Sequence, residues 1–304
     1  MRQQFVGGGA PISRRTFVRG AAVGLAAIGH AGATRVAVAA ASEKPAQRAR
    51  IAGYAACSWT LRDGSPNVFA VAHEIGLDGV QLDLGSPPDF AVGDAAARAP
   101  YKAAAEAAGV KVASVALGCL NSHPLKSDPR APGWVLAGIE AAADFGVGVL
   151  LLAFFGDGEL RDQAEMDRVG DILKEIAPAA AKKGVRLGLE NTLSARQSLG
   201  IIERSASDAV AVYYDVGNAR HWGHDALAEL PLLGPRVCEI HFKDGVNSYG
   251  DALLGEGKVD YPGVARTLHR MGYAGWITLE PHTPELVPDM KRNLAFARRI
   301  MSAA

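Results

Sequence analysis

The sequence predicts an α/β protein of the single-domain (β/α)₈ TIM barrel class. Short apolar runs of strand length recur eight times between residues 51 and 280, and their starts lie 25 to 39 residues apart. Each interval is long enough for one helix and two loops, and strands that alternate with single helices pair in parallel through right-handed crossovers. Eight such units within about 250 residues fit a closed barrel. An open doubly wound sheet is the alternative.

The predicted strands are mostly apolar, as expected for parallel strands buried on both faces. In chain order they are Ile51–Ser58, Gly79–Leu84, Val110–Leu117, Val147–Phe154, Val185–Glu190, Val210–Asp215, Val237–Phe242 and Trp276–Glu280. The clearest helices between them are Ala95–Ala108, Pro132–Phe145, Met166–Lys183 and Tyr261–Met271. Each of these four helices is followed by a glycine suited to a helix C-cap with positive φ, namely Gly109, Gly146, Gly184 and Gly272. Asp260 followed by Pro262 is typical of a helix start.

The first 41 residues differ in composition from the rest and are predicted to be a cleaved export signal. They carry five arginines and no acidic residue, and their apolar run Gly20–Gly29 is shorter than the about 20 residues that span a bilayer. Ser13–Val18 resembles a twin-arginine export signal, and Ala37–Ala41 offers a small-residue cleavage site. A disordered basic tail or an uncleaved membrane anchor is the alternative.

The predicted signal sets the domain organisation and the expected location. Residues 42–304 should form the barrel, and their length of about 260 residues is close to that of a typical (β/α)₈ barrel. We expect the twin-arginine export machinery as a partner, a periplasmic or otherwise exported location, and no stable membrane anchor.

Charge and cysteine content exclude several classes of protein. The chain has 32 basic and 32 acidic residues, but without the five arginines of the signal 27 basic residues remain, a net charge of −5. Such a chain lacks the basic surface that binds nucleic acid. Three cysteines exclude a disulfide framework and are expected to be small core residues. No G-x-G-x-x-G motif follows a strand, so no nucleotide cofactor is expected.

Ligands suited to a hard metal stand at the ends of the last four predicted strands. They are Glu190, Asp215, His241 and Glu280. The C-terminal ends of barrel strands face the active-site mouth, where a buried carboxylate is costly unless it is paired or bound to a metal. Three carboxylates and one imidazole could hold one divalent Mn, Mg, Co or Zn ion. Each residue could instead be a salt-bridged cap of its own strand.

Several motifs resemble those of the xylose isomerase-like TIM barrel superfamily, the sugar phosphate isomerase/epimerase family. The markers are Glu190 with Asn191, the Y-D-V-G-N run Tyr214–Asn218, the I-H-F-K-D run Ile240–Asp244, the G-E-G-K-V-D-Y run Gly255–Tyr261 and the closing segment Gly272–Glu280. The resemblance covers nearly all of residues 42–304.

The resemblance implies that the four strand-end residues bind one divalent metal and that Glu190 and Glu280 also exchange protons with a substrate carbon. A metal on a carbonyl and its neighbouring hydroxyl acidifies the C–H between them, so one carboxylate can remove the proton and the other can return it. We therefore expect an isomerase or epimerase of a sugar or polyol that acts through an enediolate bound to the metal.

Two other functions remain open. Expulsion of a β-leaving group from the same enediolate would make the enzyme a lyase or dehydratase on a keto-sugar or keto-glycoside. A non-catalytic sugar-binding barrel is the third possibility. No arginine cluster or phosphate loop is visible, so we expect an unphosphorylated substrate. An oligomer is possible.

The chain departs from the epimerase branch at two positions that this branch uses for other residues. Asn218 replaces a histidine three residues after the metal-binding aspartate, and Asn247 replaces an arginine six residues after the metal-binding histidine. Substrate contacts are expected from Trp59, Asp83, His123, Asn218, His221 and Lys243. Lys243 could instead pair with Asp244, and Asp83 could cap its strand. Asn121 and His282 lie near the same strand ends.

The endonuclease IV branch of the superfamily does not fit this sequence. The resemblance implies that this branch binds three zinc ions through additional histidines. Here Asn218 and Asp83 stand at two strand ends without histidine, and the stretch from residue 245 to 260 contains none. Together with the acidic balance, this excludes a DNA-repair enzyme.

Overall fold

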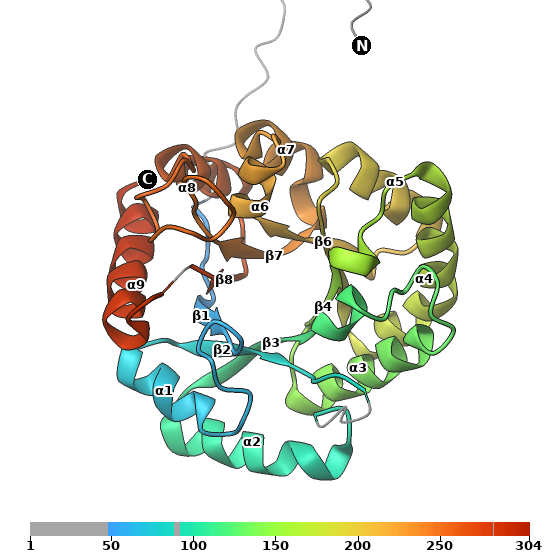
Figure 1. Cartoon of the computed structure of the whole chain (residues 1–304), viewed down its shortest axis with the longest axis horizontal. Helices are drawn as coiled ribbons and strands as arrows, with labels where there is room; N and C mark the ends of the chain where they lie inside the picture. The colour runs from blue at the N-terminus through green and yellow to red at the C-terminus, as the bar shows by residue number, and fades with distance from the viewer. Residues whose placement is uncertain (1–47, 88–91, 282) are drawn as a thin grey trace, which may run out of the picture. The chain divides into compact units, whose positions relative to one another are not determined.

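Eight parallel strands close into a barrel, in the order β1 to β8, with helices around the outside (Figure 1). The structure is a computed structural model, and it describes residues 48–87, 92–281 and 283–304. It confirms the predicted (β/α)₈ barrel. The predicted export signal, residues 1–41, lies outside the described residues.

The strands agree with the sequence prediction to within two residues at either end. Their bounds are β1 Gly53–Cys57, β2 Gly79–Asp83, β3 Lys111–Leu117, β4 Val149–Phe154, β5 Arg186–Asn191, β6 Val210–Asp215, β7 Val237–Phe242 and β8 Trp276–Leu279. Pairing of β8 with β1 closes the barrel and places Gly53 beside Trp276. The register between β2 and β3 shifts, because Val80 lies opposite Val112 and Gln81 opposite Ser114, which makes Ala113 the extra residue of a bulge in β3.

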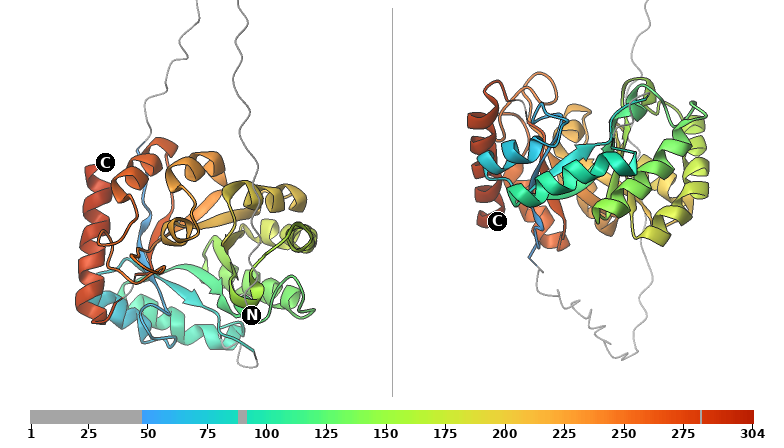
Figure 2. Two further views of the ribbon diagram at one scale, coloured as in Figure 1. Left: turned by 45° about the horizontal axis from the view of Figure 1, so that its top comes forward. Right: turned by 90° about the horizontal axis from the view of Figure 1, so that it is seen from below.

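The helices lie outside the strands, as the side view shows (Figure 2). They are α1 Val68–Ile75, α2 Ala95–Ala108, α3 Ala131–Phe145, α4 Gln163–Lys183, α5 Ala195–Ser205, α6 Val216–His221, α7 Ala226–Leu233, α8 Tyr261–Met271 and α9 Leu286–Ala303, with short 3₁₀ turns η1 Gly118–Asn121, η2 Gly156–Gly158 and η3 Gly234–Arg236. The four predicted glycines end their helices with φ between 63° and 72°. The Asp260 carboxylate accepts a hydrogen bond from the Gly263 amide (2.9 Å) at the start of α8, as expected of an N-cap. Among the described residues, no helix is long and apolar enough to cross a membrane.

Apolar side chains form two layers, one between strands and helices and one inside the barrel. The inner layer consists of Ala116, Val149, Leu151, Ala153, Ala211, Tyr213 and Cys238. Near the mouth, β3 and β4 contribute the small side chains Ala116 and Ala153, so the barrel interior is not filled on that side. The cavity described below occupies this space.

Candidate active site

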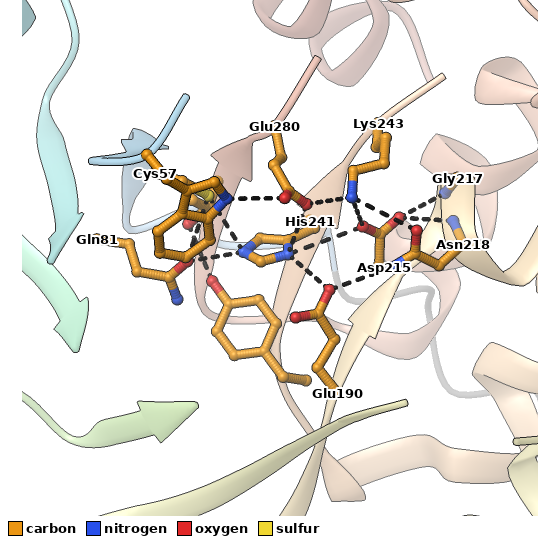
Figure 3. Close-up of polar contacts among 12 residues, drawn as sticks. Cys57, Gln81, Glu190, Asp215, Gly217, Asn218, His241, Lys243 and Glu280 are labelled. Atoms are coloured by element: carbon orange, nitrogen blue, oxygen red, sulfur yellow. Dashed lines mark hydrogen bonds and ion pairs between the residues drawn. The ribbon is translucent and has the colours of Figure 1, made fainter. Parts of the chain in front are cut away.

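The structure brings the four predicted ligands together at the C-terminal mouth of the barrel (Figure 3). One ligand atom from each of Glu190, Asp215, His241 and Glu280 lies within 4.8 Å of the others. Asp215 is the last residue of β6, Glu190 and His241 are the next-to-last residues of β5 and β7, and Glu280 directly follows β8. The parallel strands therefore deliver all four side chains to one point, as the sequence predicted.

His241 lies at the centre of this group and is fully buried. Its Nδ1 atom is 3.1 Å from Glu190 Oε1, 3.4 Å from Glu280 Oε2 and 3.8 Å from Asp215 Oδ2. Burial alone would lower the pKa of the imidazole, but contacts with Cys57 and Glu190 hold that pKa well above its ordinary value. The carboxylates thus form a strongly negative environment on one side of the ring.

Lys243 brings a positive charge into the same group. Its Nζ atom is 2.6 Å from Glu280 Oε2 and 3.3 Å from Asp215 Oδ2, and the residue is only 6% exposed. Burial lowers the pKa of Lys243, but these carboxylates outweigh that effect and hold the pKa well above its ordinary value. Burial raises the pKa of Glu280, but the Lys243 and His241 charges outweigh it and leave that pKa below its usual range.

The alternative that Lys243 pairs with Asp244 is wrong, because Asp244 binds backbone amides instead. Its buried carboxylate accepts four hydrogen bonds of 2.9–3.1 Å, from the backbone N–H groups of Gly245, Gly255, Gly257 and Val259. A Cβ atom at Gly257 would collide with this carboxylate. Asp244 therefore ties the I-H-F-K-D motif to the G-E-G-K-V-D-Y motif and holds the loop between β7 and α8.

Hydrogen bonds orient the carboxylates. Asp215 Oδ1 accepts from the amides of Gly217 (2.7 Å) and Asn218 (2.9 Å) at the start of α6. Asn218 Nδ2 donates to Glu190 Oε1 (3.3 Å), and the Trp59 indole N–H donates to Glu280 Oε1 (2.8 Å). Because one oxygen of Asp215 and one of Glu280 are held in this way, their second oxygens face the centre of the group.

A cavity of about 370 Å³ opens over this group. Its polar side carries Glu190, Asn218, Lys243 and Glu280. Its opposite side is formed by small or apolar residues of β3, β4 and the segments that follow them, namely Ala116, Gly118, Leu151, Ala153 and Phe155. Trp59, Asp83, Asn121 and Tyr249 complete the lining. Four of the six predicted substrate contacts therefore line the cavity: Trp59, Asp83, Asn218 and Lys243.

The structure places the other two predicted contacts outside this lining. His123 packs edge-on against Trp134, with ring centroids 5.4 Å apart. His221 is exposed and packs against Trp222 and Tyr249. His282 lies outside the described residues.

Asp83 lines the cavity but also closes its own strand. Its Oδ1 accepts from the Gly85 amide (2.7 Å) and its Oδ2 from the Gly118 amide (3.0 Å). Burial raises the pKa of Asp83, against the effect of these two hydrogen bonds. The structure thus supports the cap, the second of the two roles considered for this residue.

Sequence reasoning missed two polar residues of the site. Gln81 is fully buried in β2, and its Oε1 atom lies 2.8 Å from His241 Nε2. A glutamine in the middle of an apolar strand was the available signal, since a buried amide needs partners. Tyr249 lies in the loop after β7, where no pattern marks it; its ring is 5.3 Å from Lys243 Nζ.

The three cysteines are free and buried, as expected of core residues. Cys57 lies closest to the site, with its Sγ atom 3.5 Å from His241 Nε2. Burial raises the pKa of this thiol to about 12. It therefore remains a neutral thiol at ordinary pH, without the thiolate that a nucleophile needs.

The structure is a closed barrel with a carboxylate–histidine cluster at the ends of its last four strands. This is the face at which TIM-barrel enzymes carry their active sites, and the cluster is a candidate metal site. The family model described as the xylose isomerase-like TIM barrel matches residues 69–300. The chain belongs to this family, and the predicted family relationship is confirmed.

Individual relatives agree with this assignment. The 2-epi-5-epi-valiolone 7-phosphate 2-epimerase of Actinoplanes sp. is 31% identical over 214 residues, which cover 69% of this chain and 78% of that protein. An L-ribulose 3-epimerase structure superimposes with a TM-score of 0.69 and 19% identity, over 83% of this chain and 95% of that one. The structure of a xylose isomerase-like TIM barrel protein from Mycobacterium smegmatis in complex with magnesium superimposes with a TM-score of 0.65 and 16% identity, over 78% of this chain and 88% of that one. The two structures show the same fold, and the relative from Actinoplanes is by name an epimerase.

Proposed function

We propose that the protein is a divalent-metal-dependent epimerase or isomerase of a small sugar or polyol, with Glu190 and Glu280 as its acid and base. The observation that carries this proposal is the convergence of Glu190, Asp215, His241 and Glu280 within 4.8 Å at the barrel mouth. Both glutamates also line the cavity, so they are placed to reach a bound substrate. The epimerase from Actinoplanes supports the reaction class.

The four side chains fit a divalent cation. Carboxylates and an imidazole are ligands that Mn²⁺, Mg²⁺, Co²⁺ and Zn²⁺ accept. Asp215 Oδ2 is buried and accepts no hydrogen bond from the described residues, and Lys243 Nζ lies 3.3 Å from it and 2.6 Å from Glu280 Oε2. One ammonium thus faces two of the three carboxylates, and the remaining buried negative charge is costly unless it is paired or bound to a metal. A divalent ion held there would polarise a substrate carbonyl and make the neighbouring C–H more acidic.

Glu280 and Glu190 have different partners, which suits them to opposite tasks. Glu280 receives the Trp59 indole N–H and faces the Lys243 ammonium, and both contacts favour its charged form. It is therefore suited to remove a proton from carbon. Glu190 receives the Asn218 amide at 3.3 Å and lies 3.1 Å from His241 Nδ1, without the ammonium contact of Glu280, and it can return a proton. The Lys243 ammonium can stabilise negative charge that develops on a substrate oxygen.

Metal analysis followed by a sugar screen in deuterated water tests this proposal. The mature protein, reconstituted with Mn²⁺, should bind one ion per chain. On its substrate it should place solvent deuterium on the carbon next to the carbonyl. Metal well below one ion per chain after reconstitution would contradict the proposal. Release of a leaving group in the same screen would point to a lyase, and binding without deuterium exchange to a sugar-binding barrel.

We also propose that the protein is exported by the twin-arginine pathway. The proposal is supported by the arginine pair at residues 14 and 15, the apolar run Gly20–Gly29 and the small residues at Ala37–Ala41. Cell fractionation should recover the wild-type chain outside the cytoplasm and the double variant Arg14→Lys/Arg15→Lys inside it. The same distribution of both chains would contradict export by this route.

A further inference from the structure

We infer that Gln81 on β2 is a positioning residue that fixes the orientation and the tautomer of the candidate metal ligand His241. The inference rests on the proposed metal site. It concerns the side of the imidazole that faces away from the carboxylates, where Gln81 and Cys57 lie (Figure 3).

The imidazole of His241 is held between two different environments. Its Nδ1 atom faces the carboxylates of Glu190 and Glu280, at 3.1 and 3.4 Å. On the opposite edge, Nε2 lies 2.8 Å from the amide oxygen of Gln81. An amide oxygen only accepts hydrogen bonds, so Nε2 must carry the proton in this contact. Both His241 and Gln81 are fully buried, and water therefore has no access to replace either partner.

The amide of Gln81 is itself fixed in one orientation. Its Nε2 donates to Ser114 Oγ on β3 (3.0 Å), and its Oε1 also accepts from the Cys57 thiol (3.3 Å). A flipped amide would place its NH₂ group against two donors and lose both contacts. The bulge in the neighbouring strand β3 adds a backbone cause, because its extra residue Ala113 brings Ser114 opposite Gln81.

This arrangement selects one nitrogen as the metal ligand. With one proton fixed on Nε2, Nδ1 is the nitrogen that faces the carboxylates, and when a cation displaces the proton of Nδ1 the electron pair of this atom is available to it. A metal-bound histidine commonly donates its other N–H to a fixed acceptor, which sets the ring orientation. Here the acceptor is neutral, so it orients the ring without adding a further negative charge to a site that already holds three carboxylates.

The test is the Mn²⁺ affinity of the full chain after removal of bound metal with a chelator, measured by competition with a fluorescent chelator. Gln81→Met keeps the volume but removes the hydrogen bonds to His241, Ser114 and Cys57, and it should raise the Kd for Mn²⁺ by about 10- to 100-fold. Gln81→Glu keeps an oxygen acceptor for His241 and should lie within about tenfold of the wild type. Ser114→Ala leaves the His241 contact in place and should weaken binding less than Gln81→Met.

Thermal melting without metal separates positioning from a merely structural role. A wild-type Kd for Gln81→Met, or an equal loss in Gln81→Met and Gln81→Glu, would overturn the inference even if both variants melt earlier. Should Gln81→Met fail to fold, NMR of the Zn²⁺-loaded wild type decides: a proton on Nε2 of His241 supports the inference, and a proton on Nδ1 overturns it. A wild type that binds neither Mn²⁺ nor Zn²⁺ would instead contradict the proposed metal site, and the inference with it.

Discussion

The two halves of the barrel mouth are built in different ways. The half from β5 to β8 holds all four candidate metal ligands together with Asn218 and Lys243, joined by hydrogen bonds and ion pairs. The half from β1 to β4 offers mainly a wall of small and apolar side chains from β3 and β4. In the first half, each group depends on its neighbours for charge and orientation. In the second half, the shape of the empty space decides what can bind. We therefore expect substitutions in the two halves to impair different properties of the protein.

The largest effect is expected from Glu280→Gln in the polar half. The amide can neither take up a proton from carbon nor carry the charge that faces Lys243, so kcat should fall by about 10³-fold or more. The fold should be retained, which circular dichroism checks. Glu256→Gln is the matched control, because Glu256 is exposed and its ion-pair partner among the described residues is Arg292 on the surface. Wild-type turnover in Glu280→Gln, on any identified substrate, would refute the assigned role.

Asp244→Ala should lower the stability of the fold and is not expected to act on the catalytic step itself. It removes an acceptor of four backbone N–H groups, and hydrogen bonds to a charged group contribute about 1.5–3 kcal/mol each without adding fully. We expect the free energy of unfolding in urea to fall by about 3 kcal/mol or more. Asp244→Asn keeps one oxygen acceptor and should lose less. Equal stability of the alanine variant and the wild type would show that the loop is held by other contacts.

The polar half was predictable from the sequence for a physical reason. A carboxylate or imidazole at the end of an apolar strand is conspicuous, and the parallel barrel brings such ends together, as Glu190 and Asp215 show. Strand and helix bounds were equally accessible, because glycine caps such as Gly109 mark the ends of helices.

What the sequence did not reveal depends on three-dimensional contacts. The partner of Lys243 was left open between two choices, and only the packing of β6, β7 and β8 shows that it faces Asp215 and Glu280. The apolar wall was not predicted, since alanines such as Ala153 are ordinary in any strand. His123 and His221 follow strand ends in the sequence, yet His123 lies in a loop and His221 at the end of α6, and neither lines the cavity.

The Ala153→Leu substitution tests whether the apolar half of the mouth acts through its shape. The larger side chain would fill part of the cavity, so KM should rise by about 10- to 100-fold, the range of one or two misplaced methylene groups, while kcat changes little. Steady-state kinetics on the substrate found in the screen separates the two parameters. Ala70→Leu makes the same change at an exposed position of α1 and should leave both unchanged. A loss confined to kcat would contradict the view that this wall acts through shape.

Trp59→Phe should have the smallest effect of the series. The residue is 39% exposed, and the change removes one N–H donor from Glu280 but keeps an aromatic ring. We expect kcat to fall by about tenfold, which corresponds to about 1.4 kcal/mol. Trp222→Phe is the control, since Trp222 is exposed and does not line the cavity. A loss as large as that of Glu280→Gln would mean that Trp59 has a more direct part in the reaction.

The division of the mouth has a consequence for how such a protein can diversify. If residues 53–155 were exchanged for those of another barrel, the four candidate metal ligands, Asn218 and Lys243 would remain. The apolar wall of the cavity would change, and with it the range of substrates that fit. Among the described residues, three side chains of this segment contact the candidate metal ligands, namely the indole of Trp59, the amide of Gln81 and the thiol of Cys57. A chimera that preserves these three side chains should keep its reactivity while its substrate preference changes, and a chimera that loses them should lose both.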